Sequence, residues 1–148
     1  MRFYISSCLE NKDRVAELAS VLTGRGHELT YDWTGHGDIR SQGERVMSEV
    51  AFSELRAVRD AELMIALLPG GRGSHTELGL AIATRSNKRI IIWSEDGREF
   101  TDPESICAFY FHPSTERIVC PFETLKVLFD REQISSDILN TVKLEGSY

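Results

Sequence analysis

The sequence predicts an α/β fold in which helices cover both faces of a parallel sheet of about five strands, in the order 2-1-3-4-5. Two continuous apolar runs, residues 63–68 and 89–93, have the length and composition of strands that are buried on both faces. Apolar residues at helical spacing lie before, between and after these runs, so strand and helix alternate along the chain. Such alternation is typical of parallel strands joined by crossover helices, and it predicts a flavodoxin-like or Rossmann-like doubly wound sheet.

The first half of the chain contains two predicted strand–helix units. A strand is expected at residues 2–6, followed by a helix that starts near Asn11 and stops at Gly24. A second strand is expected at 27–33, and a polar loop then leads into a long helix at 42–59. The loops after both strands are expected at one edge of the sheet, because parallel strands bring their carboxyl ends together.

In the second half, the 63–68 strand ends in a glycine-rich loop, and a helix begins after Ser74. The strand at 89–93 follows, and a charged loop runs over residues 94–105. The remaining expected elements are a short fifth strand and two helical pieces, at residues 117–120, 122–129 and 133–140. The chain has no internal repeat and no linker, so residues 1–148 are predicted to form a single domain.

Composition argues against several functional classes. The net charge is −6 and Lys and Arg do not cluster, which argues against nucleic acid and anionic membranes as partners. No apolar run approaches the roughly 18 residues needed to span a bilayer, and the chain enters its first strand without a targeting segment. The cysteines Cys8, Cys107 and Cys120 share no metal-ligand spacing, and the histidines are scattered. We therefore expect a cytoplasmic protein with free thiols, no metal site and no cofactor.

The glycine-rich loop and the helix after it carry the strongest functional signal. Ser74 is a good N-cap, which places Glu77 at about the third helical position. Backbone N–H groups of such a loop favour an anion such as a phosphate, and they can keep a nearby carboxylate ionised. The alternative is that Glu77 only completes a capping box with Ser74. A cap needs no glycines, however, whereas a ligand that approaches the backbone closely does, so Gly71, Gly73 and Ser74 are candidate binding positions.

Residues on and after the first two strands complete the candidate site. Tyr4 has a hydroxyl suited to orient a carboxylate, although a strand tyrosine is often an ordinary core aromatic. Ser6 and Ser7 are candidates to hold a sugar or phosphate, and the alternative is that they only cap the next helix. Asp32 and Trp33 end the second strand where such folds often hold a ribose or a base, and a turn beside a half-buried Trp explains them equally well.

Three segments, at residues 4–7, 31–33 and 73–81, together resemble the nucleoside 2-deoxyribosyltransferase family. That family includes relatives that hydrolyse the N-glycosidic bond of deoxynucleoside 5′-monophosphates. The resemblance implies a nucleoside 2-deoxyribosyltransferase-like domain whose ligand is a small nucleoside or nucleotide. It also implies that Glu77 is the nucleophile and that Tyr4 lies beside it.

The resemblance covers about residues 1–93, and this chain departs from the family pattern within it. Family members often carry an acidic or hydroxyl residue six positions before the nucleophile, where this chain has Gly71. They also carry a base-contacting aspartate on the helix before the central strand, where this chain has Phe52, Ser53 and Glu54. These departures leave the substrate open.

Residues 69–77 are also similar to the Pro-Gly-Gly-x-Gly-[Thr/Ser]-x-x-Glu motif of the Lonely-guy phosphoribohydrolases, which release adenine-type bases from nucleoside monophosphates. Both resemblances imply cleavage or transfer at an N-ribosyl bond. An ionised carboxylate can stabilise or capture the oxocarbenium-like centre of such a reaction, and Asp38, Glu54 or water would protonate the departing base. The alternative class is a non-catalytic module for a nucleotide or ADP-ribose-type ligand, against which the presence of Glu77 argues.

The first resemblance also implies a homodimer or a larger closed assembly. An apolar stripe on the 42–59 helix is broad enough for both a core and a partner, and it consists of Met47, Val50, Ala51, Leu55 and Val58. Near the C-terminal part, Phe109 and Phe111 are expected to form a core cluster. The alternative is that Tyr110 and His112 reach the site of a neighbouring subunit.

Overall fold

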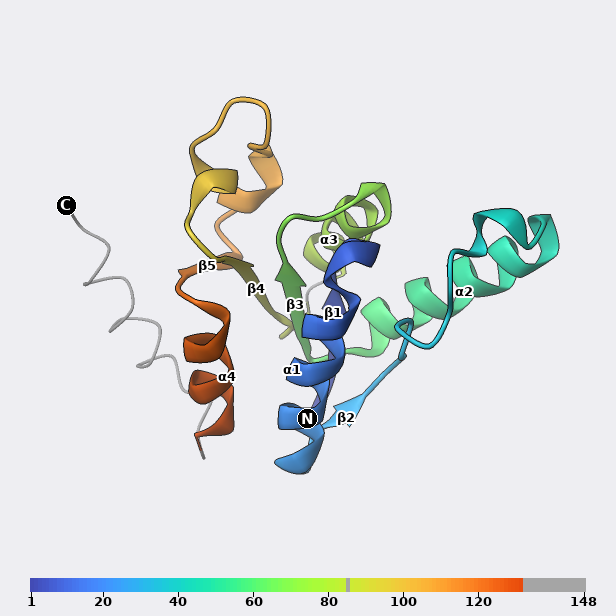
Figure 1. The fold of residues 1–148 in the computed structure, drawn as a ribbon, viewed down its shortest axis with the longest axis horizontal. Helices are drawn as coiled ribbons and strands as arrows, with labels where there is room; N and C mark the ends of the chain where they lie inside the picture. Colours follow the sequence, from blue (N-terminus) through green and yellow to red (C-terminus); the bar gives the residue numbers. More distant parts are fainter. Residues whose placement is uncertain (85, 132–148) are drawn as a thin grey trace.

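The computed structural model describes residues 1–84 and 86–131, which form one parallel sheet in the order β2-β1-β3-β4-β5. The five strands are β1 Arg2–Ser6, β2 Glu28–Leu29, β3 Leu63–Leu67, β4 Arg89–Ser94 and β5 Thr115–Val119. Strands β1 and β3 lie in the middle of the sheet, where the connections change direction (Figure 1). The predicted fold class and strand order are therefore confirmed.

Helices pack on both faces of this sheet, as the predicted doubly wound arrangement requires. The four α-helices are α1 Lys12–Gly24, α2 Glu44–Asp60, α3 Arg72–Ala83 and α4 Phe122–Asp130. Short 3-10 helices occur at η1 Leu9–Asn11, η2 Ile39–Ser41, η3 Arg98–Phe100 and η4 Ala108–Phe111. Helices α1 and α4 contact each other on one face, and α2 and α3 contact each other on the opposite face (Figure 1). None of the described helices is both long and apolar enough to cross a membrane.

The core is divided by the sheet into two apolar clusters, because successive strand residues point to opposite faces. Phe3 and Ile5 pack with α1 and α4, whereas Tyr4 packs with apolar residues of α2 and α3. Every residue of β3 is buried, as the apolar run predicted. The side-chain alternation along β1 therefore decides that Tyr4 points toward α3, the helix that carries Glu77.

Several element boundaries differ from those predicted. The second strand is only Glu28–Leu29 rather than 27–33, because it is an edge strand that pairs with β1 alone. The fifth strand is Thr115–Val119, two residues earlier at its start than predicted. The helical piece predicted at 133–140 lies outside the described residues.

The aromatic residues between β4 and β5 do not pack as predicted. Phe109 and Phe111 are 52% and 45% exposed, so the expectation that they form a core cluster is wrong. Tyr110 between them is only 2% exposed, because the single 3-10 turn of η4 directs it inward. Its ring meets Phe100 edge-on, with the ring centroids 5.8 Å apart.

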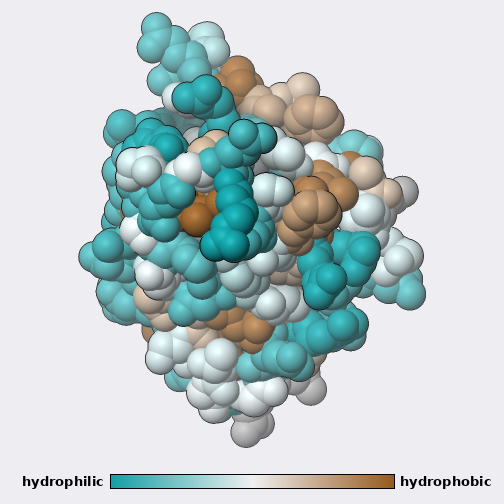
Figure 2. Space-filling view, turned by 90° about the vertical axis from the view of Figure 1, so that its right-hand side faces the viewer, coloured by the Kyte–Doolittle hydropathy of each residue, from teal (hydrophilic) through white to brown (hydrophobic). Residues whose placement is uncertain are grey.

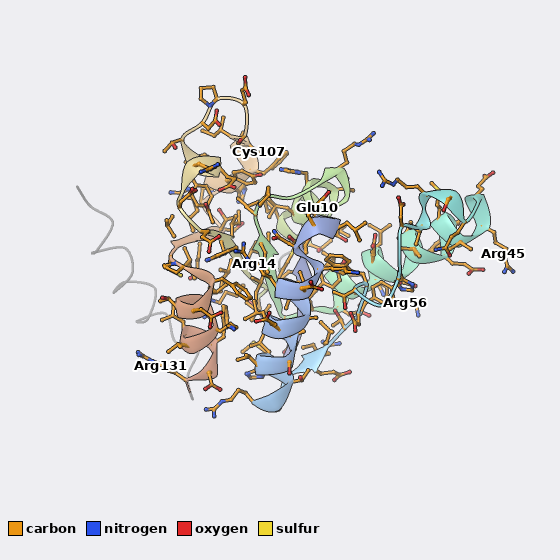
Figure 3. All side chains as sticks on the ribbon, in the orientation of Figure 1. Glu10, Arg14, Arg45, Arg56, Cys107 and Arg131 are labelled. Carbon is orange, nitrogen blue, oxygen red and sulfur yellow. The ribbon has the colours of Figure 1, made fainter. Side chains whose placement is uncertain are left out.

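Helix α2 packs through only part of its predicted apolar stripe. Val50 and Val58 are buried, whereas Met47 and Leu55 are each 44% exposed. The N-terminal half of the helix projects beyond the sheet, with Arg45 near its outer end (Figures 1 and 3). From that side, apolar patches interrupt a largely hydrophilic surface (Figure 2). An apolar surface on α2 is thus left uncovered by the described part of the chain.

Candidate active site

A cavity of about 390 Å³ opens at the carboxyl ends of β1 and β3, which is where doubly wound sheets bind ligands. Tyr4 on β1 and Glu77 on α3 form part of its wall, and Gly71 and Gly73 form another part. Trp33 lines it from the segment after β2, and Glu54 and Val50 line it from α2. The two central strands, the loops after them and α2 thus enclose a single site.

Glu77 is buried in this wall, with only 7% of its surface exposed, and β1 supplies a hydroxyl for each of its carboxylate oxygens. The Tyr4 hydroxyl donates to Oε1 over 2.7 Å, and the Ser6 hydroxyl donates to Oε2. Tyr4 and Ser6 are two residues apart on one strand, so their side chains lie on the same face of the sheet. The predicted pairing of Tyr4 with Glu77 is present, and Ser6 proves to be a second partner of the carboxylate.

Burial dominates the electrostatics of Glu77. Loss of solvent raises the pKa of Glu77 to about 7, although the hydrogen bonds from Ser6 and Tyr4 act in the opposite direction. Burial, and then the negative charge of Glu77, raise the pKa of Tyr4 well above its usual range. Tyr4 therefore keeps its proton and remains a donor. Burial is the larger effect on this carboxylate, and its two side-chain donors lie on β1 rather than in the glycine-rich loop.

The predicted start of α3 is also corrected. The helix begins at Arg72 with Gly71 as its N-cap, so Ser74 is the third helical residue and Glu77 the sixth. The Ser74 hydroxyl accepts a 3.1 Å hydrogen bond from the N–H of Gly71. A capping box between Ser74 and Glu77 therefore does not form, because Glu77 lies one turn further on and its carboxylate bonds to β1 instead. Glycine at position 70 permits this earlier start. A Cβ there would lie only 2.9 Å from the Cβ of Ser74, which is too close for any other residue without a shift of Ser74.

Two glycines at the beginning of α3 face open space. A Cβ built on Gly71 or Gly73 meets no protein atom within 4 Å, and both residues line the cavity. Packing of the chain therefore does not require glycine at either position. Their lack of side chains instead leaves room in the cavity beside the N-terminus of α3, as expected where a ligand approaches the backbone.

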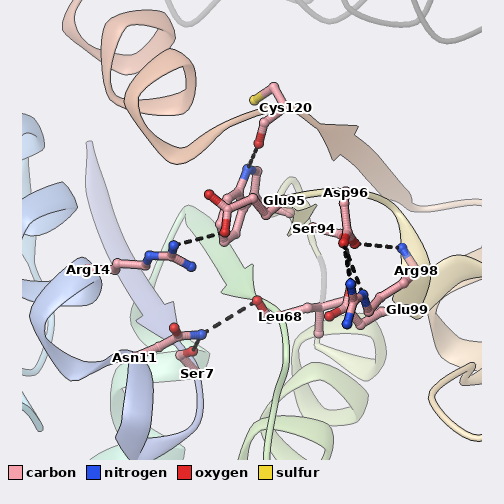
Figure 4. Close-up of polar contacts among 11 residues, drawn as sticks. Ser7, Asn11, Arg14, Leu68, Ser94, Glu95, Asp96, Arg98, Glu99 and Cys120 are labelled. Carbon is pink, nitrogen blue, oxygen red and sulfur yellow. Dashed lines mark hydrogen bonds and ion pairs between the residues drawn. The ribbon is translucent and has the colours of Figure 1, made fainter.

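Ser7 lines the cavity, but its hydroxyl also ties together the two loops that form it. Ser7 Oγ donates to the carbonyl oxygen of Leu67 over 2.7 Å. Asn11 donates through Nδ2 to Ser7 Oγ over 3.0 Å and to the carbonyl oxygen of Leu68 (Figure 4). Asn11 is a residue of the cavity loops that the sequence did not indicate. Its position at the end of a 3-10 turn after a buried strand gives no signal for a contact with Leu68, which lies 57 positions away.

Trp33 and Asp32 have different roles despite being adjacent. Trp33 lines the cavity, and its ring orientation is fixed by a 2.8 Å hydrogen bond from Nε1 to the carbonyl oxygen of Ile5. Asp32 is not part of the described cavity wall, and its Oδ1 accepts a 2.9 Å bond from the N–H of Thr34. The interpretation of Asp32 as a turn residue is therefore confirmed, whereas Trp33 presents an aromatic surface to the cavity.

Asp38 and Glu54 both line the cavity, but their surroundings shift their pKa values in opposite directions. Arg40 donates to both carboxylate oxygens of Asp38, and this lowers the pKa of Asp38 to about 2. Burial raises the pKa of Glu54. The charge of Glu54 also raises the pKa of Glu77, so the two carboxyl groups interact. Of the two candidate acids, Glu54 is the one whose surroundings favour the protonated form.

Within residues 1–84 and 86–131, no group of three or more His, Cys, Asp and Glu side chains is arranged to hold a metal ion. The chemistry available to the described site is that of two interacting carboxyl groups, the hydroxyls of Tyr4 and Ser6, and the N-terminal end of α3.

Comparison with known proteins identifies the fold. No protein-family model matches the sequence, and no curated protein sequence matches it. The structure is similar to that of a CMP N-glycosidase from Clostridium botulinum, BcmB, with a TM-score of 0.61 and 17% sequence identity. The similarity covers 88% of this chain and 100% of the clostridial chain. At this identity the likeness establishes that the two proteins share the doubly wound fold.

Proposed function

We propose that this protein cleaves the N-glycosidic bond of a nucleoside 5′-monophosphate. The observation that carries the proposal is the buried carboxylate of Glu77, which bonds to Tyr4 and Ser6 and lines a cavity at the centre of the sheet. The similar clostridial structure is that of an enzyme named for this chemistry on CMP, which supports the same class of substrate here. The geometry of the site is the main argument for this function, and the shared fold is additional support.

In the first step, ionised Glu77 attacks the anomeric carbon as the bond from that carbon to the base nitrogen breaks. The electron pair of the broken bond leaves with the base, and Glu54 supplies the proton that the base needs. Tyr4 and Ser6 hold both carboxylate oxygens, so the nucleophile is oriented before the substrate arrives. The product of this step is a glycosyl ester on Glu77.

In the second step, water attacks the same carbon and Glu54, now ionised, accepts the proton that water loses. The ester bond breaks and Glu77 leaves as a carboxylate, which restores the enzyme. A free base in place of water would give transfer instead of hydrolysis. We propose hydrolysis because the cavity opens to solvent and the similar structure belongs to a glycosidase.

The remaining wall of the cavity suits the other two parts of a nucleotide. The N-terminus of α3 carries partial positive charge, and Arg72 stands at its first position on the cavity wall. We assign this end to the 5′-phosphate, with Gly71 and Gly73 leaving room for it. We assign Trp33, which lines the cavity as Glu54 does, to stacking on the base.

The test is an assay of the purified protein with CMP, dCMP and cytidine, followed by chromatography of the free base. We expect cytosine and a sugar phosphate from a monophosphate, and little release from cytidine. Addition of a second free base distinguishes transfer from hydrolysis, since transfer forms a new nucleotide. Binding of these nucleotides without release of base, extended to the other common monophosphates, would overturn the proposal in favour of a non-catalytic module.

We further propose that the protein is a cytoplasmic homo-oligomer. The three cysteines form no disulfide within the described residues, as expected in a reducing compartment. Met47, Leu55 and the 75% exposed Phe52 on α2 provide apolar surface for a second copy.

A further inference from the structure

A histidine and a tyrosine that the proposed chemistry does not use connect the cavity wall to the far part of the sheet. His75 is the fourth residue of α3, and its Nδ1 lies 2.7 Å from the carbonyl oxygen of Gly71. Its Nε2 lies 2.7 Å from the hydroxyl of Tyr110 in η4. His75 thus connects a side chain of the β4–β5 segment to Gly71, the residue that caps α3 and lines the cavity.

The carbonyl oxygen of Gly71 fixes the direction of one contact, and the direction of the other follows for the neutral ring of His75. A carbonyl oxygen only accepts, so Nδ1 of His75 carries the proton and donates to Gly71. In the neutral ring Nε2 is then an acceptor, and the Tyr110 hydroxyl donates to it. The chain of donors runs from Tyr110 through His75 to the peptide of Gly71.

The Tyr110 end of this chain is firmly held. Tyr110 is nearly fully buried and packs against Phe100. Its carbonyl oxygen accepts hydrogen bonds from Thr115 Oγ1 at 3.0 Å and from Arg117 Nη1 at 3.1 Å, and both donors lie on β5. The hydroxyl that bonds to His75 is therefore anchored to the sheet.

The Gly71 end needs such an anchor. A glycine peptide explores more conformations than any other, and Gly71 has no side chain to fix it. The backbone N–H of His75 also bonds to the Gly71 carbonyl, at 3.2 Å, and the Gly71 N–H bonds to Ser74 Oγ. The ring of His75 adds a second donor to the same carbonyl, and it is the donor tied to the rest of the fold.

We propose that His75 and Tyr110 are positioning residues, which hold the Gly71 peptide and the first turn of α3 in the geometry that receives the phosphate end of the substrate. This inference rests on the proposed function for its ligand. Neither residue touches the reacting atoms. Loss of the contact therefore weakens substrate binding and leaves the chemical step nearly unchanged.

The kinetic test compares His75→Ala, His75→Asn and Tyr110→Phe, with His112→Ala as a matched control. His112 bonds to Ser114 in the same segment and is not part of the described cavity wall. We expect His75→Ala to raise KM for CMP about tenfold with kcat within about twofold of the parent. Asn retains an N–H donor close to the Nδ1 position but has no counterpart of Nε2 for Tyr110, so His75→Asn should restore only part of the loss. Equal effects of Ala and Asn on KM, or a fall in kcat alone, would overturn the inference.

A second test needs no substrate and separates this inference from the proposed function. Amide hydrogen exchange at Gly71 and at position 75 should accelerate about tenfold in His75→Ala and in Tyr110→Phe, while exchange in α1 stays unchanged. Unchanged exchange at Gly71 would refute the positioning role even if CMP is cleaved. Accelerated exchange in a protein that cleaves no nucleotide would support the positioning role and refute the function.

Discussion

The hydroxyl of Tyr4 donates a 2.7 Å hydrogen bond to Oε1 of Glu77, and 73 positions of sequence separate the two residues. Both are buried, and the contact joins the first strand of the sheet to the second turn of α3. A carboxylate removed from water is costly unless donors compensate it, and here Tyr4 and Ser6 do so only in part. Buried carboxyl groups with strongly shifted pKa values are common in catalytic sites.

The first prediction concerns the pH dependence of turnover. The first step needs Glu77 ionised and Glu54 protonated, so kcat/KM for the nucleotide should pass through a maximum with pH: it rises as the nucleophile ionises, whose pKa is raised to about 7, and falls as the acid ionises. Tyr4→Phe removes a hydrogen bond that lowers this pKa, so the rising limb should move to higher pH. Steady-state rates between pH 5 and 9, within the ranges of ordinary buffers, measure both effects. A rising part of the pH profile at the same pH in Tyr4→Phe as in the parent would contradict the assignment of that part to Glu77.

The second prediction concerns stability. Folding raises the pKa of Glu77 from 4.5 to about 7, so between these values the folded chain binds more protons than the unfolded chain. This group therefore makes stability fall as pH rises through that window, by about 3 kcal/mol in full. Glu77→Gln removes the penalty and should be more stable than the parent at pH 8, by roughly 1–3 kcal/mol.

At pH 4 the same comparison should give nearly equal stabilities, because Glu77 is then protonated in both folded and unfolded chains. Urea unfolding at the two pH values measures the difference. Glu49→Gln is the matched control, since Glu49 is exposed on α2 and pairs only with Arg45 in the described structure. A Glu77→Gln variant that is less stable than the parent at pH 8 would show that the carboxylate stabilises the fold.

Much of the fold was predictable because apolar runs and helical spacing report burial directly. The β3 run and the alternation around it were enough to predict the strand order. Boundaries of weak elements were not predictable, since β2 and the start of α3 depend on tertiary contacts. Ser74 fits the pattern of a cap, but its hydroxyl meets Gly71 because the chain passes close at Gly70.

The contact between Tyr4 and Glu77 was predictable, because residues of suitable chemistry stand on elements that meet at the carboxyl edge of the sheet. The second donor to the carboxylate, Ser6, was placed near the site but with a different role. Asn11 and the His75–Tyr110 contact could not be predicted, because hydrogen bonds between distant segments leave no periodic signal. The proposal of Glu54 rather than Asp38 as the acid likewise required the structure, because the sequence does not show that Arg40 binds Asp38 and lowers its pKa.

The third prediction tests the cavity beside α3. A methyl group at Gly73 would meet no protein atom within 4 Å but would occupy space in the cavity. Gly73→Ala should therefore fold normally and raise KM for the nucleotide at least about tenfold. Gly79→Ala is the matched control, because Gly79 lies in the same helix with equally open surroundings and is not part of the described cavity wall.

Gly79→Ala should leave KM unchanged and stabilise the chain by about 0.5–1 kcal/mol, as expected for glycine in a helix interior. Equal KM values for the two alanine variants would mean that the space at Gly73 does not receive the ligand.

The fourth prediction concerns assembly. If the exposed side of α2 binds a second copy, light scattering should give a mass of at least twice the 16.7 kDa of one chain. Leu55→Glu places a charge on that surface and should shift the mass toward the monomer. Val127→Glu on α4 is the matched control, since Val127 is also an exposed apolar residue. A monomeric parent at micromolar concentration would contradict the prediction.

The most direct test of the central claim is the rate of base release by Glu77→Gln. Gln preserves the size of the side chain and can still accept a bond from Tyr4, but it lacks the charge that attacks the anomeric carbon. We predict that kcat/KM for a nucleotide cleaved by the parent falls on the order of a thousandfold or more, while Glu49→Gln retains the parental rate. A Glu77→Gln variant that releases base at close to the parental rate would contradict the glycosidic mechanism.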